Sequence, residues 1–262
     1  FDCAILLQNA FEAALVARLA GIPERIGYAR DGRGWLLTRA VPVPERGDLP
    51  RHERFYYLEL LRRAGLLNGA PASDEIRLDA AIPARESGMR RLAEAGLGGA
   101  VVGVSPGAAY GGAKRWLPER FAESAAEVAR TLGGRIALFG SGEERVLCEA
   151  VAVLLRAQDM DARNFAGQTT LAEFIEMTAA CRVFLTNDSG GMHIASALGV
   201  PTVAVFGATD EEATGPAGPL ARVVRSPVEC SPCLLRECPI DHRCMTRVTA
   251  GLVAETALEL LK

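Results

Sequence analysis

The chain has 262 residues, a formal net charge of −3 and hydrophobic residues at 49% of its positions. This length is enough for two domains of ordinary size, and the composition is typical of a globular protein with a large core. The small negative charge argues against a nucleic-acid binder, which usually has a strong basic excess. No apolar run approaches the ~18 residues that cross a bilayer, and no signal peptide is recognisable, so we expect a cytoplasmic protein.

The first residues, FDCAILL, have no initiator Met and no polar lead-in. Residues 2–7 predict a strand of the kind found inside a parallel sheet, where a strand needs neighbours on both sides. We therefore expect the chain to lack a natural N-terminal portion. Residues 9–20 predict a helix and residues 24–28 a second strand, which together complete a β-α-β unit.

Residues 30–50 are rich in Gly, Pro and Arg and predict a loop. Residues 52–64 predict a helix with Phe55, Leu58 and Leu61 on one face. The arginines in and beside this helix have two interpretations, a solvated face or contacts to an anionic ligand. They are Arg51, Arg54, Arg62 and Arg63.

A polar connector containing Pro and Gly at residues 65–83 indicates a domain boundary. We expect a first domain at residues 1–82 and a second at residues 83–249. Residues 250–262 form a separate last segment that contains a final helix.

Short strands and helices alternate through the second domain. Strands are predicted at residues 100–104, 135–139, 164–165, 181–186, 202–206 and 222–225. Helices are predicted at residues 85–96, 118–132, 143–156 and 171–180, after Ser189 as far as Gly199, and at 252–261. The alternation indicates an α/β fold with a parallel sheet. Ligands of such sheets bind at the carboxyl ends of the strands, where the Gly-rich loops of this chain lie.

The stretch around Asp188, Ser189, Gly190 and Gly191 joins a buried strand to a helix through a tight turn. A helix N-terminus presents unpaired N–H groups and the positive end of the helix dipole, which suit a phosphate or diphosphate. The glycines would allow a ligand close to the backbone. Alternatively, Asp188 and Ser189 are only helix caps. His193, one turn into the helix, is more typical of a structural residue or phosphate neighbour than of a general base.

Residues 105–116 are mostly small and end in Lys114, Arg115 and Trp116. Small residues would let the backbone approach a ligand, and either cation could then meet phosphate charge. The segment is not a P-loop, because Lys114 is neither preceded by Gly nor followed by Ser or Thr. The other interpretation is a flexible loop with an exposed Lys-Arg pair.

Two further loops follow strand ends. In the first, Ser141 precedes Glu143 and Glu144, and a carboxylate here could accept hydrogen bonds from ribose hydroxyls. These acids could equally complement a helix dipole. In the second, Thr169 and Thr170 resemble a capped helix start, at a place where a nucleobase could rest on the backbone.

Four of the seven cysteines lie close together in sequence: Cys230, Cys233, Cys238 and Cys244. Reduced thiols at such spacing suggest a structural zinc site, although the spacing is not that of a zinc ribbon. Disulfides formed on oxidation, or free thiols packed in a loop, are the alternatives. The remaining cysteines, Cys3, Cys148 and Cys181, are expected in the core.

Three motifs, PGAAYGGAKRW, LFGSGEE and TNDSGGMHIASALGVPTVAVFG, in this order and spacing resemble the bacterial lipopolysaccharide heptosyltransferases, glycosyltransferase family 9. The segment CAILLQNAFEAALVARLAGIPERIGYARDGRGWLLT is similar to the second half of that family's first domain, so the resemblance covers nearly the whole chain. It implies an α/β fold of the GT-B type, with two Rossmann-like domains of which the N-terminal one is incomplete. It also implies that residues 250–262 pack back towards the N-terminal domain.

The resemblance implies an inverting glycosyltransferase that needs no metal or other cofactor and moves heptose from ADP-heptose to a lipid A–Kdo–heptose acceptor. Contact with the membrane would be peripheral, at the cytoplasmic face of the inner membrane. Lys114 would neutralise the donor diphosphate, and Glu143 or Glu144 would hold the ribose. The other donor-binding residues would be Ser141, Thr169, Asp188, Ser189, Gly190, Gly191 and His193.

In that family the general base is an Asp in an early loop of the first domain, which we expect before Phe1. No residue of this chain receives that role, and we expect donor binding without turnover. Which heptosyltransferase step the chain serves stays open, as does another ADP-sugar donor. A different class of function, a non-catalytic nucleotide- or metal-binding module built on the cysteines, is a further alternative.

Overall fold

A computed structural model gives the structure of residues 1–69 and 75–262. The chain divides into two compact units, residues 1–73 and 74–262, and each is described by itself. The division falls before the expected boundary between residues 82 and 83, while residues 70–74 of the expected connector lie outside the described residues. Within the described ranges, no helix has both the length and the apolar character to cross a membrane.

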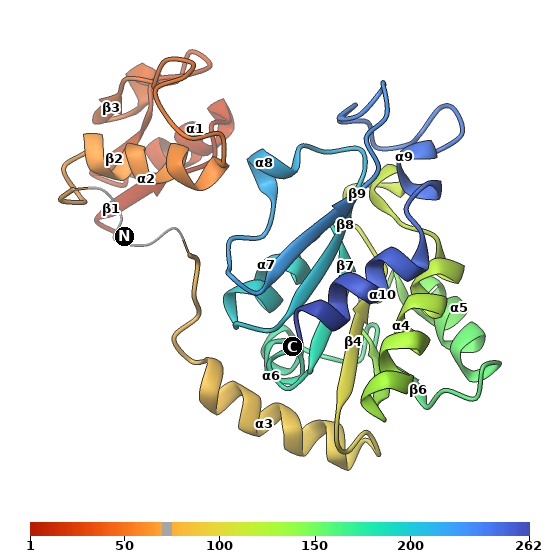
Figure 1. Cartoon of the computed structure of the whole chain (residues 1–262). Coiled ribbons are helices and arrows are strands. Elements are labelled where there is room, and N and C mark those ends of the chain that lie inside the picture. Colours follow the sequence, from red (N-terminus) through yellow and green to blue (C-terminus); the bar gives the residue numbers. More distant parts are fainter. Residues whose placement is uncertain (70–74) are drawn as a thin grey trace. The chain divides into compact units, whose positions relative to one another are not determined.

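The first unit is a three-stranded parallel sheet with strand order β1-β2-β3 (Figure 1). Its small core joins β2 and β3 to α2 through Ile26, Tyr28, Val41, Leu60 and Ala64. The elements are β1 (Cys3–Leu6), α1 (Phe11–Leu19), β2 (Glu24–Tyr28), the 3₁₀ turn η1 (Gly34–Leu36), β3 (Arg39–Val41) and α2 (Glu53–Arg63).

Strand β3 lies in the segment expected to be a loop. It has three residues, too few for a periodic pattern, and it is defined by its pairing with β2, where Ile26 is opposite Arg39. Helix α2 packs into this core through Tyr56, Leu60 and Ala64, and Phe55, Leu58 and Leu61 are half-buried.

Strand β1 differs from the expected buried strand. It pairs only with β2 among the described residues, and Ile5 remains 44% exposed. Cys3, expected in the core, is exposed for the same reason. Trp35 in η1 is also 70% exposed and packs near Phe11, with 6.3 Å between the ring centroids.

The second unit contains a six-stranded parallel sheet with strand order β6-β5-β4-β7-β8-β9. The strands are β4 (Val101–Ser105), β5 (Arg135–Leu138), β6 (Ala162–Asn164), β7 (Val183–Asn187), β8 (Thr202–Phe206) and β9 (Ala221–Arg225). In chain order, β4 is the first strand of this sheet, and β5 and β6 are added on one side of it. The next strand, β7, lies on the other side of β4 and is followed by β8 and β9. The strand order therefore reverses between β4 and β7, which is where ligands bind in sheets of this type.

Helices cover both faces of this sheet (Figure 1). They are α3 (Ala81–Glu94), α4 (Pro118–Leu132), α5 (Arg145–Arg156), α6 (Leu171–Ala179), α7 (Gly190–Ala197), α8 (Glu211–Thr214), α9 (Arg243–Thr246) and α10 (Ala250–Glu259). Helix α3 starts at Ala81, four residues before the predicted start at residue 85. The four-residue helices α8 and α9 were not predicted, because one turn shows no periodicity.

Alternate strand residues supply the two cores. Val102 and Val104 of β4 face α4, α5 and α10, whereas Val101 joins the cluster of α3, α6 and α7. This alternation follows from the two-residue period of a strand. Trp116 is 1% exposed in the first cluster and donates its indole N–H to the Val248 carbonyl at 3.2 Å. Helix α10 packs here within the second unit, and its expected packing towards the first domain stays a prediction.

Candidate functional site

A cavity of about 430 Å³ opens at the carboxyl ends of the strands around the point where the strand order reverses. Loops that follow β4, β5, β6 and β7 all contribute to its wall, as expected for parallel strands that end at one edge of a sheet. The lining residues are Ser105, Gly107, Ala109, Gly140, Ser141, Glu144, Thr169, Thr170, Leu171, Phe174, Ser189, Gly190 and Gly191.

One wall of the cavity is the first turn of α7. Ser189 precedes the helix in an extended conformation, and its side chain does not cap the helix. Its hydroxyl lies 3.2 Å from that of Thr186 instead. A Cβ on Gly190 would meet no atom within 4 Å, so this residue faces open space. The helix N-terminus, with its unpaired N–H groups, is therefore accessible from the cavity.

Another wall carries the carboxylate of Glu144. The Ser141 N–H donates to Glu144 Oε2 at 2.8 Å. The other oxygen, Oε1, would lie only 2.0 Å from a Cβ on Gly107, so the absence of a side chain at Gly107 makes room for this carboxylate. The structure thus holds one acid in a defined position at the cavity wall.

A buried ion pair lies next to α7 in the sequence. Lys114 Nζ is 2.6 Å from Asp188 Oδ2, and the two side chains are only 15% and 7% exposed. The Thr209 hydroxyl donates to the same oxygen at 2.6 Å. The N-cap position of α7 is Ser189, so Asp188 is not a helix cap. Because an unpaired charge at such a place would be costly, each partner depends on the other.

The ten residues predicted to bind the donor fall into three groups. Six line the cavity: Ser141, Glu144, Thr169, Ser189, Gly190 and Gly191. Lys114 and Asp188 pair with each other and stand outside the lining. Glu143 and His193 are exposed residues outside the lining, so that of the two acids Glu144 is the one at the cavity.

Sequence reasoning missed the apolar wall formed by Leu171 and Phe174 at the start of α6. Thr170 and Glu173 make a reciprocal capping box there, which fixes where the helix begins. The Phe174 ring packs edge-on against Phe139, with 5.5 Å between centroids. Leu171 is 66% exposed. An apolar residue in the first turn after a Gly-Gln-Thr-Thr cap was the available signal.

The cysteines do not form a metal centre in the part of the chain that the structure describes, because no three metal-ligating side chains converge there. All seven thiols are free. Cys230 is exposed whereas Cys244 is buried, and burial raises the pKa of the Cys244 thiol. The structural zinc site proposed for Cys230, Cys233, Cys238 and Cys244 is therefore not supported: the first three are free thiols in a loop, and Cys244 is a free thiol in α9.

The first unit has a polar cavity of its own, of about 440 Å³, which three arginines line: Arg30, Arg46 and Arg51. Asn9 donates to the Tyr56 hydroxyl at 3.1 Å in the same wall. Among the arginines that the sequence singled out, only Arg51 lines this cavity.

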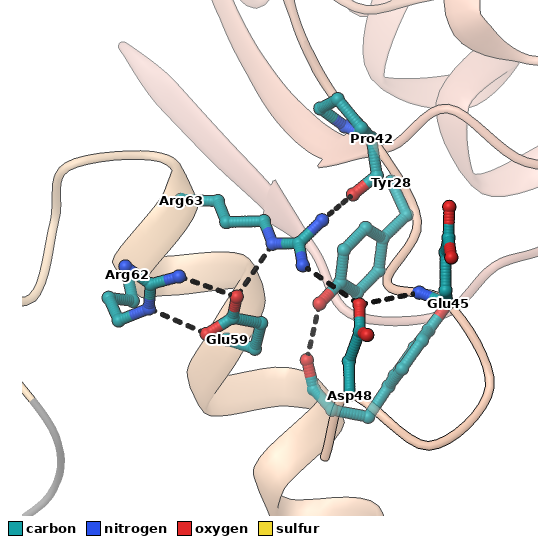
Figure 2. A network of polar contacts seen from close by, with 8 residues as sticks. Tyr28, Pro42, Glu45, Asp48, Glu59, Arg62 and Arg63 are labelled. Carbon is teal, nitrogen blue, oxygen red and sulfur yellow. Dashed lines mark hydrogen bonds and ion pairs between the residues drawn. The ribbon is translucent and has the colours of Figure 1, made fainter.

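Arg62 and Arg63 have a different partner, as Figure 2 shows. Both pair with Glu59 on their own helix, with closest N–O distances of 2.6 Å. The bonds from Arg62, with those from Arg63, lower the pKa of the Glu59 carboxyl to about 2, although its burial opposes this. Arg54 instead lies over the Phe55 ring at 4.5 Å. Arg62 and Arg63 thus neutralise a buried acid.

Comparisons with known proteins show the family and the fold of the chain. The sequence model of glycosyltransferase family 9 (heptosyltransferase) matches residues 1–243. Lipopolysaccharide heptosyltransferase 2 of Escherichia coli is 33% identical over 229 residues, which cover 86% of this chain and 65% of that protein. Lipooligosaccharide heptosyltransferase 2 of Campylobacter jejuni is 36% identical over 165 residues, covering 62% of this chain and 51% of that protein.

Among solved structures, that of E. coli ADP-heptose lps heptosyltransferase II has a TM-score of 0.79 and 29% identity, and the match covers 100% of this chain and 76% of that one. The fold is therefore α/β of the GT-B type, with three strands in the sheet of the first unit. The chain spans about half to two thirds of the length of the curated relatives it matches.

Proposed function

This chain belongs to glycosyltransferase family 9, and we propose that it forms the donor side of a heptosyltransferase that moves L-glycero-D-manno-heptose from ADP-heptose to the lipopolysaccharide core. The relatives named above favour the second heptosyl transfer. The observation that carries the proposal is the cavity at the reversal of strand order, which has a helix N-terminus in one wall and a fixed carboxylate in another.

Each part of ADP finds a suitable partner in this cavity. The diphosphate would accept N–H donors from Gly190 and Gly191 at the start of α7, where the helix dipole is positive. The ribose hydroxyls would donate to Glu144. The base would lie against the apolar side chains of Leu171 and Phe174.

Lys114, which pairs with Asp188 in the free chain, would weaken this ion pair and bind the diphosphate instead. In the transfer, an acceptor hydroxyl attacks the anomeric carbon from the face opposite the diphosphate, and the bond from that carbon to the diphosphate oxygen breaks. The negative charge that develops on ADP would be stabilised by Lys114 and the α7 N-terminus, which can do so without a metal. The hydroxyl proton passes to a general base that we assign to no residue of this chain.

The cavity of the first unit, which three arginines and the acids Glu45 and Glu53 line, would receive the acceptor. A lipid A–Kdo–heptose acceptor carries phosphates and carboxylates, and guanidinium groups pair with both of them well. Arg30, Arg46 and Arg51 are the candidates. The lipid part of the acceptor would hold the protein peripherally at the inner membrane.

Calorimetric titration with ADP tests the donor site, with UDP as the comparison. We expect micromolar binding of ADP, weaker binding of UDP, and about a tenfold or larger loss in Lys114→Met, because one charge-assisted contact is removed. Arg115→Met is the matched control, since Arg115 is the adjacent exposed cation. A folded chain that binds no ADP, or equal losses in both variants, would contradict the proposal.

The acceptor site calls for a separate binding experiment, with a soluble Kdo-containing, phosphorylated core oligosaccharide. Arg46→Glu should weaken its binding, because it removes one of three lining cations and adds a carboxylate beside Glu45 and Glu53. Arg18→Glu changes the same charge on the exposed side of α1 and should have no effect. If both reversals weaken binding equally, the effect comes from net charge and the site is elsewhere.

A further inference from the structure

Residues 230–244, which we call the cysteine loop, contact both segments that hold the Lys114–Asp188 pair. The first segment precedes Lys114 in the loop after β4. The second follows β8 and contains Thr209, which donates to Asp188. One loop that is distant in the sequence thus joins the two sides of the ion pair.

The contacts with the first segment are polar and close. The Gly112 N–H donates to Glu237 Oε1 at 2.9 Å, and the Ala113 N–H donates to the Arg236 carbonyl at 2.9 Å. The Tyr110 hydroxyl donates to the Leu234 carbonyl at 2.8 Å. These bonds fix the two residues directly before Lys114.

Glycines at two positions leave room for this contact. A Cβ on Gly111 would lie 2.3 Å from the Arg236 carbonyl oxygen, and one on Gly112 would lie 2.4 Å from Glu237 Oε2. The sequence suggested that small residues here bring the backbone close to a ligand. At these two positions they bring it close to the cysteine loop instead.

The contacts with the second segment continue from the same loop. The Leu234 N–H donates to the Ala208 carbonyl at 2.8 Å, and the Ser231 hydroxyl donates to the Gly207 carbonyl. A Cβ on Gly207 would be 2.9 Å from Cys244 Sγ, so the loop also packs closely here. Leu234 therefore bonds to both segments.

An aromatic ring adds a further link. Lys114 Nζ lies 4.9 Å from the centroid of the Tyr110 ring, and the Arg236 guanidinium carbon lies 5.3 Å from the same centroid. Such cation–π contacts stabilise a cation over a ring. The Tyr110 ring thus stabilises the position of the Lys114 side chain, and Tyr110 is itself bound to the cysteine loop through the Leu234 carbonyl.

We propose that the cysteine loop positions Lys114 and Asp188 for the donor diphosphate, and that Glu237 is the positioning residue that fixes the backbone before Lys114. This inference rests on the proposed function of the cavity. Glu237 acts through the Gly112 N–H, in a bond strengthened by the charge of its carboxylate. Without it, the short turn Gly112–Lys114 would lose an anchor and Lys114 would sample more positions.

The first test is a double-mutant cycle on ADP affinity. Glu237→Leu should weaken ADP binding about threefold to tenfold, the usual range for one hydrogen bond. Glu237→Gln should restore most of the affinity, because its amide oxygen also accepts the Gly112 N–H. In a Lys114→Met background the Glu237→Leu loss should disappear, since the residue acts through Lys114.

Glu229→Leu is the matched control, because Glu229 lies just before the loop and faces Arg243 at 3.6 Å. It should leave ADP affinity unchanged. If Glu237→Leu weakens ADP binding equally with and without Lys114, its role is a general structural one and the positioning proposal is wrong.

A second readout needs no nucleotide. The chain has two lysines, Lys114 and Lys262, so reductive ¹³C-methylation gives few signals that NMR can follow. Glu237→Leu should shift the Lys114 signal and leave that of Lys262 unchanged, whereas Glu229→Leu should shift neither. An unmoved Lys114 signal would overturn the positioning proposal. A shifted signal in a chain that binds no ADP would support positioning of the ion pair and refute the proposed donor site.

Discussion

The carboxylate of Glu144 occupies the space that a side chain on Gly107 would need, with Oε1 only 2.0 Å from the place of a Cβ. Gly107→Ala should therefore displace this carboxylate and weaken ADP binding about tenfold, if Glu144 holds the ribose. The cost in folding stability should stay below about 1 kcal/mol, because the flexible end of Glu144 can move away. Calorimetric titration and urea unfolding measure the two effects.

Gly142→Ala is the control for this variant. It adds a methyl group to the loop after β5, where a Cβ would meet no atom within 4 Å. ADP affinity should not change. Unaltered ADP binding in Gly107→Ala would show that the position of Glu144 is irrelevant to the nucleotide.

The buried Glu59 predicts a dependence of stability on pH. Its pKa is lowered to about 2 from an ordinary 4.5, mainly by hydrogen bonds from Arg62. A lowered native pKa means that the stabilisation is complete above about pH 4.5 and is lost as the pH falls towards 2. We expect the first unit to lose about 2 kcal/mol of unfolding free energy across this range.

Urea unfolding of the wild type and Glu59→Gln at a series of pH values measures this loss. The difference between the two proteins should be largest at pH above 4.5 and shrink towards pH 2. Glu12→Gln, on the exposed side of α1, should follow the wild type. A constant difference between wild type and Glu59→Gln would refute the role of this carboxylate.

The thiols should react in the order of their exposure. Burial raises the pKa of Cys148 and Cys181 to about 12, so both lack the reactive thiolate at neutral pH. Cys3 and Cys230 are the two exposed thiols and should be alkylated by iodoacetamide first. Mass spectrometry of digested samples gives the rate at each site. Equal rates for Cys230 and Cys181 in the folded chain would contradict the burial described here.

Gly88→Ala tests the contact that holds α6 in place. A Cβ on Gly88 in α3 would lie 1.8 Å from the Glu176 carbonyl oxygen of α6, which cannot move alone. Although Gly to Ala normally favours a helix by about 1 kcal/mol, we expect a net destabilisation of about 1–3 kcal/mol. Thermal unfolding measures it. Glu86→Ala, at an exposed position of the same helix, should leave the stability nearly unchanged. A Gly88→Ala variant more stable than the wild type would show that the two helices are not in contact.

Elements with complete local signals were predicted well from the sequence. Helix α4 has the predicted bounds, because Pro118 starts it and Gly133 ends it in a left-handed conformation. Strand β8 likewise has the predicted bounds. Strand β3 and helices α8 and α9 were missed, because they have three or four residues and depend on distant contacts.

In the candidate site too, residues with a local sequence signal were predicted and residues placed by distant contacts were not. Ser189 and Gly190 were found because a strand end and a helix start are visible in a short motif. Phe174 was not predicted to line the cavity, because in the sequence an apolar residue near a helix start resembles a core residue. Glu237 was not found either, since it meets Gly112 from 125 positions away in the sequence. Contacts at such separations leave no local pattern.

The two tryptophans of the chain have an experimental consequence. Trp35 belongs to the first unit and is 70% exposed, while Trp116 belongs to the second and is 1% exposed. An indole in water emits at longer wavelengths than one in an apolar environment, so unfolding of the second unit should move the Trp116 emission to longer wavelengths, whereas Trp35 already emits there in the folded chain. The wavelength shift in a denaturant titration therefore reports the melting of the second unit, without any added label.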